Sequence, residues 1–390
     1  MKVAELPAGK DLITASPQTA FPMDNHMLTH ADTTASRILS VATASTRAGN
    51  SAVPDHTRLP RVDYVELQRL LNADTLDYSA YDRKYAGGLL RYLETQLRSD
   101  VYLGTISWLK SHNHDLVFAW SERAGIPFAA YKRALGTSAR FVTMFQCWSN
   151  RQERAIQTLD LFSAMDAIIV HCRSMKRNLI RLGVHAHQVH VIPYSIDQTF
   201  FAPSAALKPQ RGRILSVGEP RSRDYPSLFR AVDGLPVELQ VAASGHWYAR
   251  EKKTNMPISV PHNVSISKRL PQAELRDLYA SSQFIVLPIH NLVYSAGATA
   301  ALEAASMGRA VIAFRSEGIV DYVIDGETGI LVDPSDVPAM RQAIQYLLAH
   351  PEEAERLGQN ARRRIEKELN LETYVCKIAD LLLRNMPSRA

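Results

Sequence analysis

The chain has 390 residues, 46% of them hydrophobic and 22% charged, which is typical of folded proteins and long enough for two ordinary domains. These values exclude a chain that is disordered, collagen-like or coiled-coil over its whole length. No apolar run reaches the roughly 18 residues of a membrane span, no secretory signal begins the chain, and the three cysteines lack disulfide-scaffold density. We therefore expect a cytoplasmic protein.

The formal net charge of +6 is concentrated in the N-terminal half, where residues 36–200 hold 20 Lys and Arg against 14 Asp and Glu. One interpretation is that this half approaches an anionic membrane surface, as a peripheral protein at the inner face of the membrane. The other interpretation is an ordinary solvated basic surface. We expect no nucleic-acid partner.

Residues 1–35 show no sustained hydrophobic period, and we expect a flexible extension there. From Arg37 onward, short apolar runs alternate with amphipathic stretches, a pattern that predicts βαβ units and a parallel sheet. The predicted strands of the first half are RILSVAT, DLVFAW, ARFVTMF, DAIIVHC and HVIPY. In the helix SMKRNLIRLG, Ser174 is expected to cap the N-terminus and Gly183 to end the helix.

A second series of strands opens at RGRILSVG and continues through VELQVAAS, NVSIS, FIVLPI, RAVIAF and GILVDP. The segment before it is turn-prone and contains two prolines, so a domain boundary is expected near residues 201–210. The pattern therefore predicts two α/β domains, over residues 36–203 and 204–370, with a final helical segment at 371–390.

Five segments resemble, in their order and spacing, the retaining glycosyltransferases of family 4, which have the GT-B fold. They are VHVIPYSIDQTFFAP, ILSVGEPRSRDYPSLFRAV, NVSISKRLPQAELRDLYASSQFIVLPI, YSAGATAALEAASMGRAVIAF and GIVDYVIDGETGILVDPSDVPAMRQAI. The resemblance is close from Asp166 to the end and extends to the first half only by domain plan. It implies two Rossmann-like, doubly wound parallel-sheet domains facing across a cleft, the first for the acceptor and the second for the nucleotide sugar. Residues 371–390 would cross back to the first domain.

The resemblance also implies a hexosyltransferase activity. Such an enzyme moves a sugar, with retention of configuration, from a nucleotide-diphosphate sugar to a hydroxyl of a lipid, glycan or small-molecule acceptor. A UDP-sugar is the favoured donor, and because the donor is a substrate we expect no cofactor. No histidine spacing is typical of zinc sites, so no metal is expected. The alternative is a GT-B protein without transferase activity, such as a sugar-nucleotide epimerase or an inactive sugar-nucleotide-binding subunit.

A donor diphosphate requires positively charged side chains or helix N-terminal amides. Arg221 and Arg223 lie after the strand RILSV and before a helix, at the edge where doubly wound sheets bind ligands. Arg223 occupies the position of the family's usual Lys, whereas the simpler alternative is a pair of surface-loop arginines. Three small residues at the start of a later helix permit close backbone approach to phosphate: Ala296, Gly297 and Ala298.

The resemblance assigns further residues to the donor. Glu303 resembles the carboxylate that accepts hydrogen bonds from the ribose hydroxyls, and Gly49 resembles a glycine loop that faces the diphosphate. Main-chain groups for the nucleotide base would come from Lys268, Arg269 and Leu270.

The resemblance implies few catalytic residues, because retaining transfer in the GT-B fold needs no obvious enzymatic base. Ser295 replaces the first Glu of the family's E-x7-E motif, and Gln146 follows a strand after which many members have a His. His171 also follows a strand and is a candidate for donor or acceptor contact. His246, at a strand end of the second half, is a candidate for the cleft.

Overall fold

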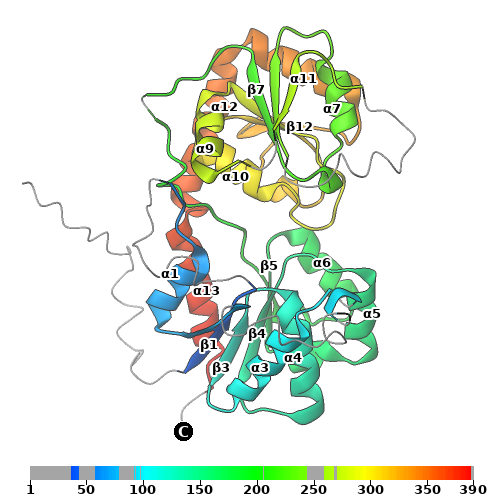
Figure 1. Ribbon diagram of the computed structural model, residues 1–390, viewed down its shortest axis with the longest axis vertical. Coiled ribbons are helices and arrows are strands. Elements are labelled where there is room, and N and C mark those ends of the chain that lie inside the picture. The colour runs from blue at the N-terminus through cyan, green and yellow to red at the C-terminus, as the bar shows by residue number, and fades with distance from the viewer. Residues whose placement is uncertain are drawn as a thin grey trace, which may run out of the picture. The chain divides into compact units, whose positions relative to one another are not determined.

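The computed structural model describes residues 37–43, 58–78, 92, 94–96, 98–204, 206–243, 259–267 and 270–387. The extension expected over residues 1–35 lies outside the described residues. The described elements form two sheets, one from each half of the sequence (Figure 1).

The first sheet contains six parallel strands in the order β2-β1-β3-β4-β5-β6. Its strands are β1 (Ile38–Val41), β2 (Asp74–Leu76), β3 (Leu116–Ala119), β4 (Arg140–Phe145), β5 (Ala167–Val170) and β6 (Val189–Val191). Successive strand residues point to opposite faces, and both faces are apolar: Val117 belongs to one buried cluster and Phe118 to the other. An all-parallel sheet requires this, because helices cover both of its sides.

The face that carries Val117 is covered by helices that connect successive strands. They are α3 (Val101–Ser111), α4 (Glu122–Leu135), α5 (Asn150–Thr158) and α6 (Arg173–Arg181), with the short 3₁₀ turns η3 (Leu161–Ala164) and η4 (Ala186–Gln188) alongside. The helix α4 begins at Ser121, whose side chain accepts a hydrogen bond from the backbone N–H of Arg123.

The opposite face of the first sheet is covered by α1 (Asp63–Leu71) and by the last helix of the chain, α13 (Leu371–Arg384). The two helices lie side by side in Figure 1. Asn370 caps α13 by accepting the N–H of Thr373 at 2.7 Å, and Tyr374 and Ile378 are buried in the cluster that contains Phe118. Residues from the end of the chain therefore complete the core of the first sheet.

The second sheet also has six parallel strands, in the order β12-β11-β10-β7-β8-β9. They are β7 (Arg213–Val217), β8 (Glu238–Ala242), β9 (Val264–Ser267), β10 (Phe284–Leu287), β11 (Val311–Phe314) and β12 (Gly329–Val332). One face packs against α9 (Gln272–Ser281) and α10 (Ala298–Ser306). The other packs against α7 (Tyr225–Val232), α11 (Val337–Ala349) and α12 (Pro351–Glu368). Two 3₁₀ turns, η5 (Pro220–Ser222) and η6 (Ile319–Asp321), complete this half.

The α/β class and the doubly wound sheets expected from the sequence are confirmed. The two sheets fall on either side of residue 203, although the domain limits themselves stay a prediction. One local expectation is wrong: Ser174 does not cap α6, which begins after Cys172 without a side-chain cap. The Ser174 hydroxyl instead donates to the carbonyl of Val293 at 2.6 Å, so a partner distant in the sequence takes it. Gly183, just after this helix, has a φ of +99°, as expected for a residue that ends a helix.

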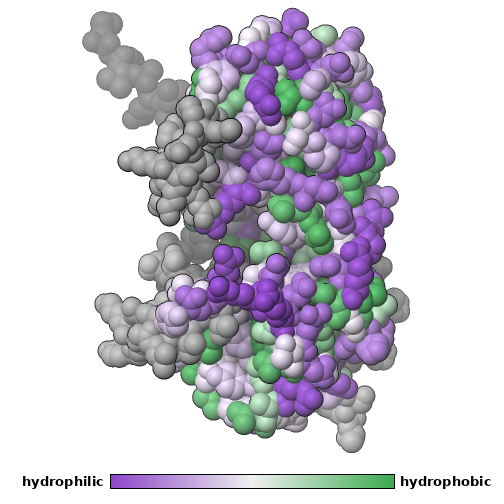
Figure 2. Space-filling model, turned by 90° about the vertical axis from the view of Figure 1, so that its right-hand side faces the viewer, coloured by the Kyte–Doolittle hydropathy of each residue, from purple (hydrophilic) through white to green (hydrophobic). Residues whose placement is uncertain are grey.

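Within the described part of the chain, no helix combines the length and apolar character needed to cross a membrane. The face drawn in Figure 2 is mainly hydrophilic, with hydrophobic residues in small separate groups. Such mixing is ordinary for a globular surface.

We expect Ile378→Ala to destabilise the first half, because Ile378 is fully buried in the cluster that α13 completes. Truncation of a core isoleucine costs about 2–5 kcal/mol of unfolding free energy. Urea unfolding can be followed by tryptophan fluorescence, since Trp108, Trp120 and Trp148 all lie in this half. The neighbouring exposed residue provides the control, Lys377→Ala. Equal midpoints for the two variants would show that α13 does not stabilise the first sheet.

Candidate functional site

The candidate residues follow the carboxyl ends of parallel strands. In such sheets every strand ends at the same edge, which is where doubly wound proteins bind ligands. In the second sheet, Gly218 follows β7 and Pro288 follows β10. In the first sheet, Trp120, Gln146 and His171 directly follow β3, β4 and β5. The topology thus gathers residues that are far apart in the sequence at one edge of each sheet.

Arg223, in the second half, is a buried charged residue. Its side chain lies after the 3₁₀ turn η5 and is only 5% exposed. Nε donates to the Val217 carbonyl at 3.1 Å, and Nη1 donates to the carbonyl and hydroxyl of Ser222 at 3.3 and 2.9 Å. All three acceptors are neutral, and none of the described residues forms an ion pair with this guanidinium. Burial lowers the pKa of Arg223, as expected for a charge removed from water.

Two glycines make room for this guanidinium. A Cβ on Gly218 would lie 2.4 Å from Nη2 of Arg223, and the φ of Gly218 is +135°. A Cβ on Gly297 would lie 3.4 Å from the same Nη2 and 2.5 Å from Cδ1 of Ile289, and its φ is +81°. Both glycines are therefore required for steric reasons. Arg223 lies between the loop after β7 and the start of α10.

Gly297 is the residue that precedes α10, a helix of nine residues. The first amides of a helix lack partners within it and carry partial positive charge, so they favour an anion. The methyl groups of Ala296 and Ala298, on either side, are buried. The buried arginine and the start of this helix therefore present positive charge to the same place.

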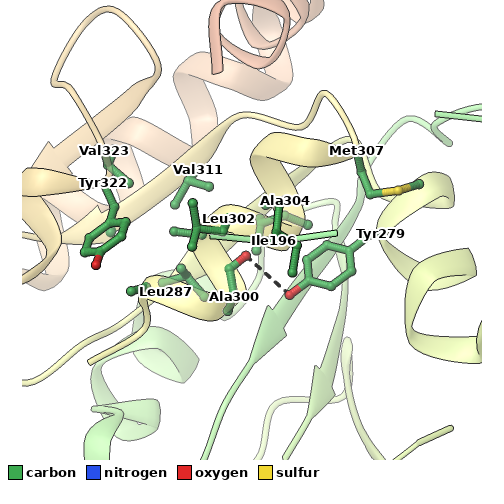
Figure 3. Close-up of a cluster of buried hydrophobic side chains, with 14 of the residues drawn as sticks. Ile196, Tyr279, Leu287, Ala300, Leu302, Ala304, Met307, Val311, Tyr322 and Val323 are labelled. Carbon is green, nitrogen blue, oxygen red and sulfur yellow. Dashed lines mark hydrogen bonds between the residues drawn. The ribbon is translucent and has the colours of Figure 1, made fainter. Parts of the chain in front are cut away.

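Glu303 lies on α10, one to two turns further along, and is 6% exposed. Its Oε2 accepts a hydrogen bond of 2.7 Å from the hydroxyl of Tyr279. The same hydroxyl contacts the carbonyl of Ala300 at 3.4 Å, as the dashed line in Figure 3 shows. Burial raises the pKa of Glu303 to about 7, and the Tyr279 hydrogen bond opposes this shift. Among the described residues, Oε1 of Glu303 has no hydrogen-bond partner.

Ser295 lies just before this helix and has a buried hydroxyl with no hydrogen-bond partner in the described structure. Its backbone is held closely, since a Cβ on Gly318 would lie 2.9 Å from Cα of Ser295. A buried hydroxyl without a partner is uncommon and costs free energy. The hydroxyl of Tyr322 is its polar neighbour: burial raises the pKa of Tyr322, and the Ser295 side chain opposes that shift.

In the first sheet, Gln146 is exposed, and its Nε2 donates to the Trp120 carbonyl at 3.3 Å. Its backbone N–H donates to Oε2 of Glu122 at 2.9 Å. Glu122 is only 4% exposed, and burial raises its pKa to about 7. Sequence reasoning missed Glu122, because an acidic residue in the first turn of a helix is usually a solvated partner of the helix dipole. The only signal was its position directly after an apolar strand.

His171 is fully buried. Its Nδ1 lies 2.9 Å from the carbonyl of Ile192 and must donate to it, so Nε2 carries the lone pair and has no partner among the described residues. The ring stacks on Tyr194 at 3.6 Å, and burial lowers the pKa to about 4. The hydroxyl of Tyr322, from the second half, donates to the His171 carbonyl at 2.6 Å. The sequence makes His171 a candidate for contact with the donor or the acceptor. Its side chain is fully buried, and the residue lies where the two halves join.

Tyr294 brings the two groups of residues together. It packs against the apolar cluster of each sheet. Burial raises the pKa of its hydroxyl, the Cys147 thiol adds to that shift, and Arg223 opposes it. Tyr294 is therefore a place where residues of the two halves meet.

The remaining expected residues have varied positions. Arg221 is exposed and has no ion-pair partner in the described regions, and Leu270 packs at the edge of the cluster around α10. Four expected residues lie outside the described residues: Gly49, His246, Lys268 and Arg269. Across the described ranges, no group of three His, Cys, Asp or Glu could hold a metal ion.

Two adjoining family models match the chain. The model described as Glycosyltransferase Family 4 matches residues 79–200, and the model described as Glycosyl transferases group 1 matches residues 200–364. Together they cover residues 79–364, which contain four of the six described strands of the first sheet and all six of the second.

The chain is similar to characterised bacterial enzymes. It is 30% identical over 209 residues to the MMP alpha-(1->4)-mannosyltransferase of Mycolicibacterium hassiacum, which is 51% of this chain and 49% of that protein. It is 27% identical over 248 residues to the glycogen synthase of Mycobacterium tuberculosis, 60% of this chain and 58% of that one. The matched part is thus about half the length of these relatives.

Solved structures share the fold over most of the chain. Sucrose-phosphate synthase from Thermosynechococcus elongatus superposes with a TM-score of 0.70 at 18% identity, covering 90% of this chain and 99% of that one. Anabaena HepE in complex with UDP-glucose superposes with a TM-score of 0.68 at 14% identity, covering 89% and 99%. The GT-B class is confirmed, and the chain belongs to the glycosyltransferases of family 4.

Proposed function

We propose that the protein is a retaining hexosyltransferase that moves a sugar from a nucleotide-diphosphate donor to an acceptor hydroxyl. The observation that carries this proposal is the buried Arg223 guanidinium, which has no described carboxylate partner and lies beside Gly297 at the start of α10. A buried charge without a counter-ion is costly. A donor diphosphate would supply the missing negative charge, and relatives that are transferases favour transfer over epimerisation.

In this proposal the diphosphate is bound by Arg223, by the exposed Arg221 and by the backbone amides at the start of α10. Glu303 accepts hydrogen bonds from the ribose through Oε1, the oxygen that Tyr279 leaves free. The resemblance further assigns the nucleotide base to main-chain groups of residues 268–270 and the diphosphate to Gly49, and of these only Leu270 is among the described residues. The hydroxyl of Ser295 and the amide of Gln146 bind the transferred sugar.

The chemical step follows from these roles. The bond between the anomeric carbon and the diphosphate oxygen breaks as the acceptor oxygen bonds to the same carbon on the same face. The acceptor proton passes to the departing diphosphate, so no enzymatic base is required. Arg223 stabilises the negative charge that grows on the phosphate. It therefore lowers the free energy of the transition state more than that of the bound substrate.

The donor sugar and nucleotide remain to be assigned by assay. UDP is favoured, and Anabaena HepE binds UDP-glucose. A relative from Mycolicibacterium smegmatis, 27% identical over 180 residues, is named as GDP-mannose-dependent. Hydrolysis and transfer assays with UDP-, GDP- and ADP-sugars would identify the donor, and an absence of turnover with all of them would contradict the proposal.

We propose that the acceptor is a hydroxyl compound bound by the first half of the chain. More specifically, we propose a lipid acceptor at an anionic membrane surface. It is supported by α6, which carries Lys176, Arg177 and Arg181. Co-sedimentation with anionic and neutral vesicles tests it. Binding to anionic vesicles that high salt abolishes is expected, and no binding at low salt would favour a soluble acceptor.

Arg223→Ala should lower kcat/KM by about 10- to 150-fold, because a hydrogen bond to a charged group contributes about 1.5–3 kcal/mol. kcat should fall as well, since the contact strengthens as the sugar departs. Arg223→Lys should recover part of the loss by retaining the charge without the bidentate geometry. Exposed Arg230 on α7 offers a control of equal charge, Arg230→Ala. Parental kinetics for a folded Arg223→Ala protein would remove the assignment.

Because the pKa of Glu303 is raised, we expect donor binding to depend on pH. Its pKa of about 7 means that the carboxylate, the better acceptor for ribose hydroxyls, forms as the pH rises through neutrality. Because both phosphates of a sugar nucleotide are already ionised in this range, donor affinity should rise between pH 6 and 8. Glu303→Gln should abolish this rise and bind the donor roughly 10- to 150-fold more weakly at pH 8. Calorimetric titration at several pH values checks this, and identical profiles for the two proteins would place the ribose elsewhere.

A further inference from the structure

A second pocket lies at the opposite end of α10 from Gly297. Four segments form it: the connection between the two sheets, the residue before β10, the turn after α10 and residues 351–363 of α12. Its volume is about 670 Å³, within the range of small-molecule sites. Since α10 has nine residues and rises about 1.5 Å per residue, this pocket lies roughly 13 Å from the start of the helix. It is therefore separate from the candidate donor site.

The pocket is strongly basic. Four arginines line it, namely Arg211, Arg309, Arg362 and Arg363, against a single acidic residue among its described lining, Glu355. Arg362 is paired with Glu366 at 2.7 Å. The other three arginines have no ion pair with any described residue. The pocket thus holds an excess of positive charge that the surrounding protein does not neutralise.

Two of these arginines are fixed by hydrogen bonds to the backbone. Nη1 of Arg362 donates to the carbonyls of Ser306 at 2.6 Å and of Phe201 at 3.1 Å. Arg309 donates to the carbonyls of Tyr279 and Ala280 at 3.2 and 2.8 Å. Arg211 and Arg363 are exposed at the same pocket. The site therefore combines rigid and adjustable guanidinium groups, which is an arrangement suited to an oxyanion.

The rest of the lining is not charged. Pro203, Pro209, Met307 and Pro351 supply apolar surface beside the arginines. Inorganic phosphate would use the charges but leave this surface without contacts. A ligand with both a phosphate and a carbon skeleton fits the whole lining.

We propose that this pocket binds a small phosphate monoester, of about the size of a phosphorylated monosaccharide or a nucleoside monophosphate. The phosphate contacts Arg211 and Arg363, and the carbon skeleton lies against the apolar wall. Arg362 also donates to the carbonyl of Ser306 at the C-terminal end of α10, so an occupant lies beside the end of that helix.

The test is calorimetric titration of the full chain with glucose 6-phosphate, adenosine 5′-monophosphate, inorganic phosphate and glucose. One of the two esters should bind, and the stronger of them identifies the source of the phosphate. The double variant Arg211→Ala/Arg363→Ala should weaken that binding at least about tenfold, since it removes two charge-assisted contacts. Glu355→Gln should strengthen it, because the variant removes the one carboxylate of the lining.

A control of equal charge uses exposed arginines outside the pocket, Arg230→Ala/Arg384→Ala, and should bind as the parent does. Equal weakening in the control would show non-specific attraction and overturn the proposal. Inorganic phosphate binding as tightly as the esters would overturn the monoester assignment, and so would the absence of binding by either ester. None of these outcomes depends on transferase activity, so they leave the donor-site proposal to its own tests.

Discussion

The parallel direction of every strand is the constraint from which the rest of this structure follows. The twelve strands of the described residues form two sheets and all run parallel to their neighbours, so each sheet ends in a single edge of strand carboxyl ends. Most of these strands are followed by a loop and a helix, and the start of that helix points toward the same edge. This geometry places Arg223 beside Gly297 in one sheet and Glu122 beside Gln146 in the other. It also requires apolar cover on both faces of each sheet.

Near those edges, ionisable side chains are buried away from water, which disfavours their charged forms. Arg223 is buried against neutral oxygens, while burial raises the pKa of both Glu122 and Glu303 to about 7. A site of this kind is stabilised when a ligand provides the missing partners, and it is costly without one. Tyr294 packs against the apolar cluster of each sheet, so residues of both halves meet there.

Much of this arrangement could be predicted from the sequence, because apolar runs and glycines determine strands and turns locally. The strands and their division into two series follow from such local patterns. Arg223 and Glu303 became candidates largely through the family resemblance, and their roles stay a prediction. Contacts through space could not be predicted in this way. The Tyr279 partner of Glu303, the use of the Ser174 hydroxyl by Val293 and the burial of Glu122 each depend on segments separated by many residues. His171 likewise has the sequence context of a site residue, and only its packing against Tyr194 reveals its setting.

The return of α13 to the first sheet has a consequence for how the protein is made. A ribosome releases the first sheet early, yet the part of the apolar face around Phe118 that α13 covers stays open until Tyr374 and Ile378 emerge. For most of synthesis that face is open to chaperones or to other nascent chains, and multidomain proteins are prone to aggregate at such a stage. Slow translation of the second half would prolong this exposure. The nascent first half therefore depends for its protection on the speed at which the rest of the chain follows it.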